Sequence, residues 1–186
     1  MGVLMTWLAL AATGAEAADD ITAPDGRREY RGQGLVMSVT ARTPAQQFAF
    51  YSARGFPEDA VRRIAQRCFL TVGIRNGRSD IVWLELDEWR FIDDQNREHK
   101  STRRDEWNAL WRRINLPPAY RATFGWTQLP ERRDLHPGES AGGNVTLAPP
   151  PAVFALEARF RTGGDGHGSL LQVRFDNLSC PRGDTL

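Results

Sequence analysis

Hydrophobic residues at every second position predict short β-strands along much of the chain. The clearest stretch runs from Cys68 to Asp94, where this alternation covers residues 70–74 and again 82–86. A period of two places successive side chains on opposite faces, as in a strand with one buried face. Asn76-Gly77 lies between the two segments, and both residues tolerate positive φ, so the stretch is predicted to form a β-hairpin.

The same alternation predicts further strands at 35–40, 122–126, 145–147, 154–160 and 171–175. Helices are expected near 43–67, because Thr43 and Pro44 suit a helix start, and near 103–116, because tryptophans and aliphatic residues recur there at i, i+3, i+4 and i+7. About seven short strands with helices confined to two insertions predict a mainly β chain, folded as an antiparallel β-sandwich. A closed barrel is the alternative, because periodicity alone does not separate the two.

The N-terminal residues predict export from the cytoplasm. Residues 4–12 form an apolar run that is too short to span a bilayer, and Ala15-Glu16-Ala17 follows it as an A-x-A cleavage pattern. Met1–Ala17 is therefore predicted to be a signal peptide, although no Lys or Arg precedes the apolar run. A misassigned start codon or an uncleaved hydrophobic leader would explain that departure.

The mature protein is expected to be periplasmic or secreted, with no stable membrane insertion after cleavage, because no second long apolar run occurs. The domain division is a flexible lead-in over 18–34, one domain over 35–180 and a polar tail over 181–186.

Cys68 and Cys180 are the two cysteines of the chain. An even pair in an exported protein favours one disulfide, and closing so long a loop is worth roughly 4–5 kcal/mol in the chain-entropy model. The alternative is a pair of buried or reactive thiols. No CxxC spacing supports redox catalysis.

The charge balance argues against a strongly charged partner. The chain has 24 basic and 23 acidic residues, and removal of residues 1–17 takes away Glu16 alone, which leaves a net charge of +2. So small a net charge predicts no nucleic-acid partner and no strong attraction to an anionic membrane. All the basic residues except Lys100 are arginines, which a GC-rich genome explains.

The sequence offers few candidates for catalysis or metal binding. His99, His136 and His167 lack metal-ligand spacing, so we expect no metal and no cofactor. The acidic turn at 93–96 lacks the spacing of a calcium loop and is predicted to be a solvated turn. No nucleophile elbow occurs, and a Cys–His hydrolase would need Cys68 as a free thiolate. We therefore expect a protein that is not an enzyme.

Tryptophan and arginine gather between residues 83 and 133. Aromatic faces beside guanidinium groups bind sugar rings or acidic polymers, and both residue types dominate protein interfaces. The alternative is that the tryptophans pack the helix onto the sheets and the arginines form its solvated rim. Strand alternation places Trp83 opposite the inward residues, either exposed or covered by an inserted helix. The candidate binding surface consists of Trp83, Trp107, Trp111, Arg104, Arg112 and Arg113.

Three segments carry a resemblance to a known family. TVGIRN, the later FIDDQNRE, and LHPGESAGGNVTL over Leu135–Leu147 resemble strand and turn segments of bacterial extracytoplasmic immunoglobulin-like domains. The resemblance implies an immunoglobulin-like β-sandwich and an exported binding module rather than a reaction.

The expected function is a non-catalytic interaction module that binds a protein or an envelope polymer. The alternative is a binding protein for an acidic or glycan ligand through the tryptophan and arginine surface. A hydrolase is the remote third possibility.

Overall fold

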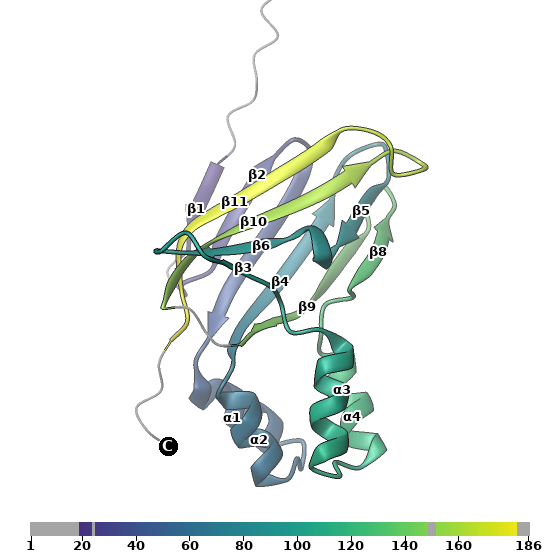
Figure 1. Cartoon of the computed structure of the whole chain (residues 1–186). Helices are drawn as coiled ribbons and strands as arrows, with labels where there is room; N and C mark the ends of the chain where they lie inside the picture. The colour runs from purple at the N-terminus through teal and green to yellow at the C-terminus, as the bar shows by residue number, and fades with distance from the viewer. Residues whose placement is uncertain (1–18, 24, 149–151, 182–186) are drawn as a thin grey trace, which may run out of the picture.

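Two antiparallel sheets form the body of the protein, and four helices lie at one end of them (Figure 1). The structure is a computed structural model that describes residues 19–23, 25–148 and 152–181. The predicted signal peptide, Met1–Ala17, and residues 182–186 of the predicted tail lie outside the described residues. The mainly β class predicted from the alternation is confirmed.

The first sheet has the strand order β1-β2-β3-β4-β9. Its strands are β1 (Asp19–Thr22), β2 (Arg28–Gly32), β3 (Leu35–Arg42), β4 (Cys68–Asn76) and β9 (Ser140–Leu147).

The second sheet is built around β10 (Val153–Thr162), which pairs with β11 (Leu170–Ser179) on one side. On its other side β10 pairs with β6 (Arg90–Asp93) along one half and with β5 (Val82–Glu85) along the other. The short 3-10 helix η1 (Leu86–Glu88) connects β5 to β6. The outer strands are β8 (Arg132–Leu135), beside β5, and β7 (Glu98–His99), beside β6.

One hydrophobic core lies between the two sheets. The alternation of β4 points Leu70, Val72 and Ile74 into it, where they join aromatic residues of the second sheet such as Phe91 and Phe160. The predicted disulfide is confirmed: Cys68 at the start of β4 is bonded to Cys180, just after β11, with 5.3 Å between their Cα atoms. The bond therefore ties the first sheet to the second.

The helices have a core of their own. They are α1 (Pro44–Ser52), α2 (Glu58–Ala65), α3 (Arg104–Arg113) and α4 (Pro118–Trp126). Their inward side chains form a second cluster, which Phe69 of β4 joins to the outer face of the first sheet. The first three helices fall within the two predicted insertions. No helix in the described part of the chain is both long and apolar enough to cross a membrane.

The predicted hairpin at Cys68–Asp94 is wrong. β4 pairs with β3 and β9, while β5 belongs to the other sheet, so the chain crosses between sheets after Asn76. Neither Asn76 nor Gly77 has a positive φ. Asn76 is instead fully buried, and its amide donates to the carbonyls of Asp80 and Leu135 at 2.8 Å. The asparagine serves as a polar bridge between the sheets rather than as a turn residue.

Two other expectations are also wrong. The lead-in predicted over 18–34 contains β1 and β2, which extend the first sheet. The strand predicted at 122–126 lies in α4, which has Pro118 in its first turn. Phe124 is buried and Trp126 is exposed, so the two residues do not share a face, as a strand would require. A proline pair that ends one helix also suits the start of the next.

Candidate binding site at the helical end

Two of the predicted surface tryptophans are buried in the helical core. The rings of Trp107 and Trp111 stack with their centroids 4.9 Å apart, and the Trp107 Nε1–H donates to Thr146 Oγ1 of β9 at 2.9 Å. These residues attach α3 to the first sheet, as the packing alternative expects.

Trp83, Arg112 and Arg113 lie elsewhere on the molecule. Trp83 is half-buried under the glycine-rich loop between β10 and β11, and its Nε1–H donates to the Gly163 carbonyl at 2.7 Å. Arg112 and Arg113 are exposed in the last turn of α3. Of the six predicted residues, only Arg104 lines the grooves described next.

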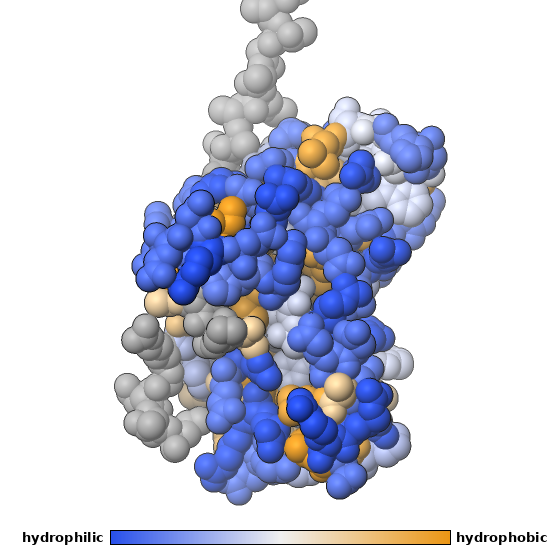
Figure 2. Space-filling model, in the orientation of Figure 1, coloured by the Kyte–Doolittle hydropathy of each residue, from blue (hydrophilic) through white to orange (hydrophobic). Residues whose placement is uncertain are grey.

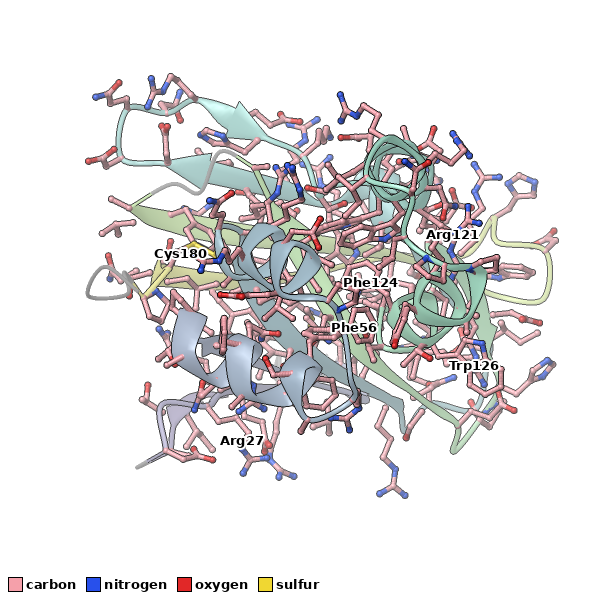
Figure 3. All side chains as sticks on the ribbon, turned by 90° about the horizontal axis from the view of Figure 1, so that it is seen from below. Arg27, Phe56, Arg121, Phe124, Trp126 and Cys180 are labelled. Atoms are coloured by element: carbon pink, nitrogen blue, oxygen red, sulfur yellow. A yellow bond between two sulfur atoms is a disulfide. The ribbon has the colours of Figure 1, made fainter. Side chains whose placement is uncertain are left out.

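The most exposed large hydrophobic residue among the described ones is Trp126, at 90% exposure. It ends α4, and Figure 3 shows its side chain directed away from the helix, while Phe124 points toward the other helices. The face of the molecule in Figure 2 is mostly hydrophilic, with small separate hydrophobic areas, one of them over the helical end. An indole exposed to this degree on such a surface is typical of a contact residue.

Trp126 separates two open grooves. The first, which we call the α3–α4 groove, has a volume of about 580 Å³ and is lined by Arg104 and Asn108 of α3 and by Arg121 of α4. The second, the α1–sheet groove, has a volume of about 560 Å³ and is lined by Arg42 of β3 and by residues of α1. We refer to Trp126 and these two grooves together as the Trp126 surface.

Both grooves are positively charged. No acidic side chain lines either of them in the described part of the chain. The guanidinium groups of Arg104 and Arg121 have no hydrogen bond or ion pair with any described residue, and the Nε of Arg121 is buried. Arg42 donates to Thr71 Oγ1 at 2.9 Å and has no acidic partner there. Glu131 accepts from the Arg104 backbone N–H and lies 3.7 Å from the Arg103 guanidinium.

A hydrogen-bond network fixes the floor of the α1–sheet groove. Arg42 donates to Thr71, Thr71 donates to Asn144 Oδ1, and Asn144 Nδ2 donates to the Thr127 carbonyl, so β3, β4 and β9 are joined to the end of α4. Thr127 Oγ1 donates to the Phe124 carbonyl, so it accepts from the Tyr51 hydroxyl at 2.8 Å. Burial of the hydroxyl raises the pKa of Tyr51 to about 12.

A small cavity of about 30 Å³ lies between α3, α4 and β9, large enough for one or two water molecules. Trp111 and Arg121 line it, and the N–H groups of Trp111 Nε1 and Arg121 Nε are buried without a hydrogen-bond partner.

Hydrogen bonds to the Asp93 side chain stabilise the acidic turn at 93–96. Residues 94–96 are exposed, as expected for a solvated turn, but Asp93 is buried. The Asp93 carboxylate accepts from the backbone N–H groups of Gln95 and Arg97. The hydrogen bond with His99 Nε2 at 2.9 Å is the main cause that holds the Asp93 pKa well below its usual range. The described residues contain no cluster of three His, Cys, Asp or Glu side chains placed to hold a metal.

The sequence prediction missed most residues of this site. Trp126 and Arg121 belong to the tryptophan- and arginine-rich stretch, but alternation predicts a strand over 122–126. In the structure both residues lie on α4 and line the α3–α4 groove. A helical reading of 118–126 would have set Trp126 apart from the buried Phe124. Arg42 and Gln47 had no local signal, because only the fold brings them beside Trp126. Comparison with protein-family models, with curated proteins and with solved structures finds no match for this chain.

Proposed function

We propose that this chain is an exported, non-catalytic binding module that engages a component of the cell envelope through the Trp126 surface. The observation that carries the proposal is Trp126 itself, an indole at 90% exposure between two grooves whose arginines have no acidic partner among the described residues. Tryptophan and arginine are the residue types most enriched among the residues that contribute most binding energy at interfaces.

Export is part of the proposal. The Cys68–Cys180 disulfide is typical of an oxidising compartment such as the periplasm, and the first 17 residues have the pattern of a signal peptide. We also propose that the two sheets form an immunoglobulin-like sandwich. The shared core and a disulfide between the sheets support this assignment, and so does the resemblance of the TVGIRN and LHPGESAGGNVTL segments to such domains.

A binding role is favoured over the hydrolase alternative by the state of Cys68. A Cys–His hydrolase needs a thiolate nucleophile, and the Cys68 sulfur is bonded to Cys180 instead.

Co-sedimentation with isolated cell envelopes tests the proposal. We expect the wild-type protein to sediment with the envelopes, and Trp126→Ala to remain in the supernatant. Leu170→Ala is the matched control, because Leu170 is also an exposed hydrophobic residue but lies on β11. Failure of the wild type to sediment, or equal sedimentation of wild type and Trp126→Ala, would overturn the assignment of this surface.

A further inference from the structure

The charge of the chain is divided unevenly between the helical end and the rest. Residues 43–67 and 102–130 contain nine arginines and four acidic residues, a net charge of +5. The whole chain has a net charge of +1, so all the other residues together have −4. The small overall charge therefore conceals a basic end, and such a field attracts anionic ligands.

Within this basic end, the Trp126 surface offers donors that the protein does not use. Arg104 and Arg121 on one side of Trp126 have no partner among the described residues, and Arg42 on the other side is bonded only to Thr71. Each groove also contains an amide side chain without a hydrogen bond to any described residue, Asn108 in the α3–α4 groove and Gln47 in the α1–sheet groove.

These groups match one ligand chemistry better than others. Arginine pairs with a carboxylate through two parallel hydrogen bonds, amides exchange hydrogen bonds with hydroxyl groups, and an indole face packs against the C–H face of a sugar ring. Nucleic acid fits less well, because single strands require successive aromatic platforms. Both grooves share the indole of Trp126, and the other aromatic ring that lines them, Phe50, has the Arg54 guanidinium over its face at 3.4 Å. The grooves are open and meet at Trp126, which suits a chain that continues across it.

We infer that the Trp126 surface binds an acidic oligosaccharide, a chain of carboxylate-bearing sugars. One sugar ring stacks on Trp126, its neighbours on one side place carboxylates against Arg104 and Arg121, and those on the other side reach Arg42. The inference rests on the proposed binding function and adds the class of ligand to it.

Calorimetric titration with three families of acidic oligomers tests the inference: oligogalacturonate, alginate oligomers and oligosialic acid. We expect at least one family to bind, and its methyl-ester form, which keeps the sugar chain but removes the charge, to bind at least tenfold more weakly. No binding by any family, or equal binding of the ester, overturns the inference. The envelope sedimentation result is independent of these probes, so the proposed function can survive that failure.

Single variants then locate the site on the protein. We expect Trp126→Ala and Arg121→Gln each to weaken binding at least tenfold, and Arg112→Gln to change it less than twofold. Arg112 is the matched control, because it lies on α3 outside both grooves and its replacement removes the same charge. A loss with Arg112→Gln as large as that with Arg121→Gln would mean a diffuse charge effect and no site. Equally tight binding of inorganic polyphosphate would mean anion binding without sugar recognition, and would also overturn the inference.

Oligomer length provides the last test. We expect affinity to rise until the chain fills both grooves, and Arg42→Gln to weaken the binding of hexamers more than that of dimers. Circular dichroism of each variant checks that its fold is intact. A length-independent affinity would contradict a ligand that crosses Trp126.

Discussion

Gly143 of β9 lies directly against the backbone of Gln128 and Leu129, the segment that follows α4. A Cβ atom at Gly143 would lie 2.4 Å from the Leu129 backbone nitrogen and 2.6 Å from the Gln128 carbonyl carbon. Ordinary contacts begin near 3.4 Å, so Gly143→Ala forces the segment after α4 back by about 1 Å. That segment is held by three hydrogen bonds with Asn144, at 2.8–3.0 Å. Their loss at about 1 kcal/mol each, with overpacking of about 1–3 kcal/mol, predicts a destabilisation of roughly 4–6 kcal/mol.

The neighbouring glycine provides the control. A Cβ atom at Gly142 would lie 3.5 Å from the Val72 carbonyl oxygen, which is an ordinary contact, and Gly142 is exposed. We expect Gly142→Ala to change the free energy of unfolding by less than about 1 kcal/mol, since alanine also restricts the unfolded chain. Urea unfolding of both variants with the disulfide intact measures the difference. A Gly143→Ala protein within 1 kcal/mol of wild type would refute the close docking of α4 on β9.

Three further predictions concern stability. Replacement of Cys68 and Cys180 by serine should lower the free energy of unfolding by roughly 4–5 kcal/mol, because the bond closes a separation of 112 residues; urea midpoints within error of wild type would contradict this. Trp107→Ala should lower the free energy of unfolding by about 3–5 kcal/mol, because Trp107 is buried, whereas Trp126→Ala should leave the melting temperature nearly unchanged. Similar melting temperatures for the two variants would contradict the burial of Trp107 and the exposure of Trp126. The pKa of Tyr51 is raised to about 12 in the folded state, so the folded protein keeps the Tyr51 proton above pH 10 while the unfolded chain loses it. The free energy of unfolding should therefore fall as the pH rises from 10 towards 12, by up to about 3 kcal/mol. The difference in unfolding free energy between wild type and Tyr51→Phe should therefore shrink over this range, and a constant difference would exclude Tyr51 as the cause.

The sequence predicted those parts of the fold that depend on one face of one element. The alternation of β4 is of this kind, because burial of one strand face constrains it strongly. The pairing of Cys68 with Cys180 was predictable for another reason: the chain has two cysteines, so one intramolecular bond is possible. The hairpin failed because the side chain of Asn76 is satisfied by a strand distant in sequence, which no local pattern reveals. α4 failed because three alternating residues fit a strand and a helix equally well.

The sequence predicted which stretch of the chain contributes to the candidate site, but not which of its residues lie at the surface. The tryptophan- and arginine-rich stretch contains Trp126, Arg104 and Arg121, but which aromatic rings are buried depends on how α3 packs on β9. Trp107 and Trp111 looked equally suitable as surface residues, and they fill the helical core instead. Arg42 joins the site from β3, far away in the sequence, so its role follows from tertiary structure alone.

The central claim is that ligand binds at the Trp126 surface, and a ¹H–¹⁵N NMR titration tests it most directly. On addition of the acidic oligosaccharide that binds, the account predicts that the Trp126 indole N–H and the Nε–H groups of Arg104 and Arg121 shift together and saturate with one dissociation constant. The indole of Trp83, held by the Gly163 carbonyl under its own loop, should not move. Saturable shifts confined to other residues, with the Trp126 indole unchanged, would contradict the account.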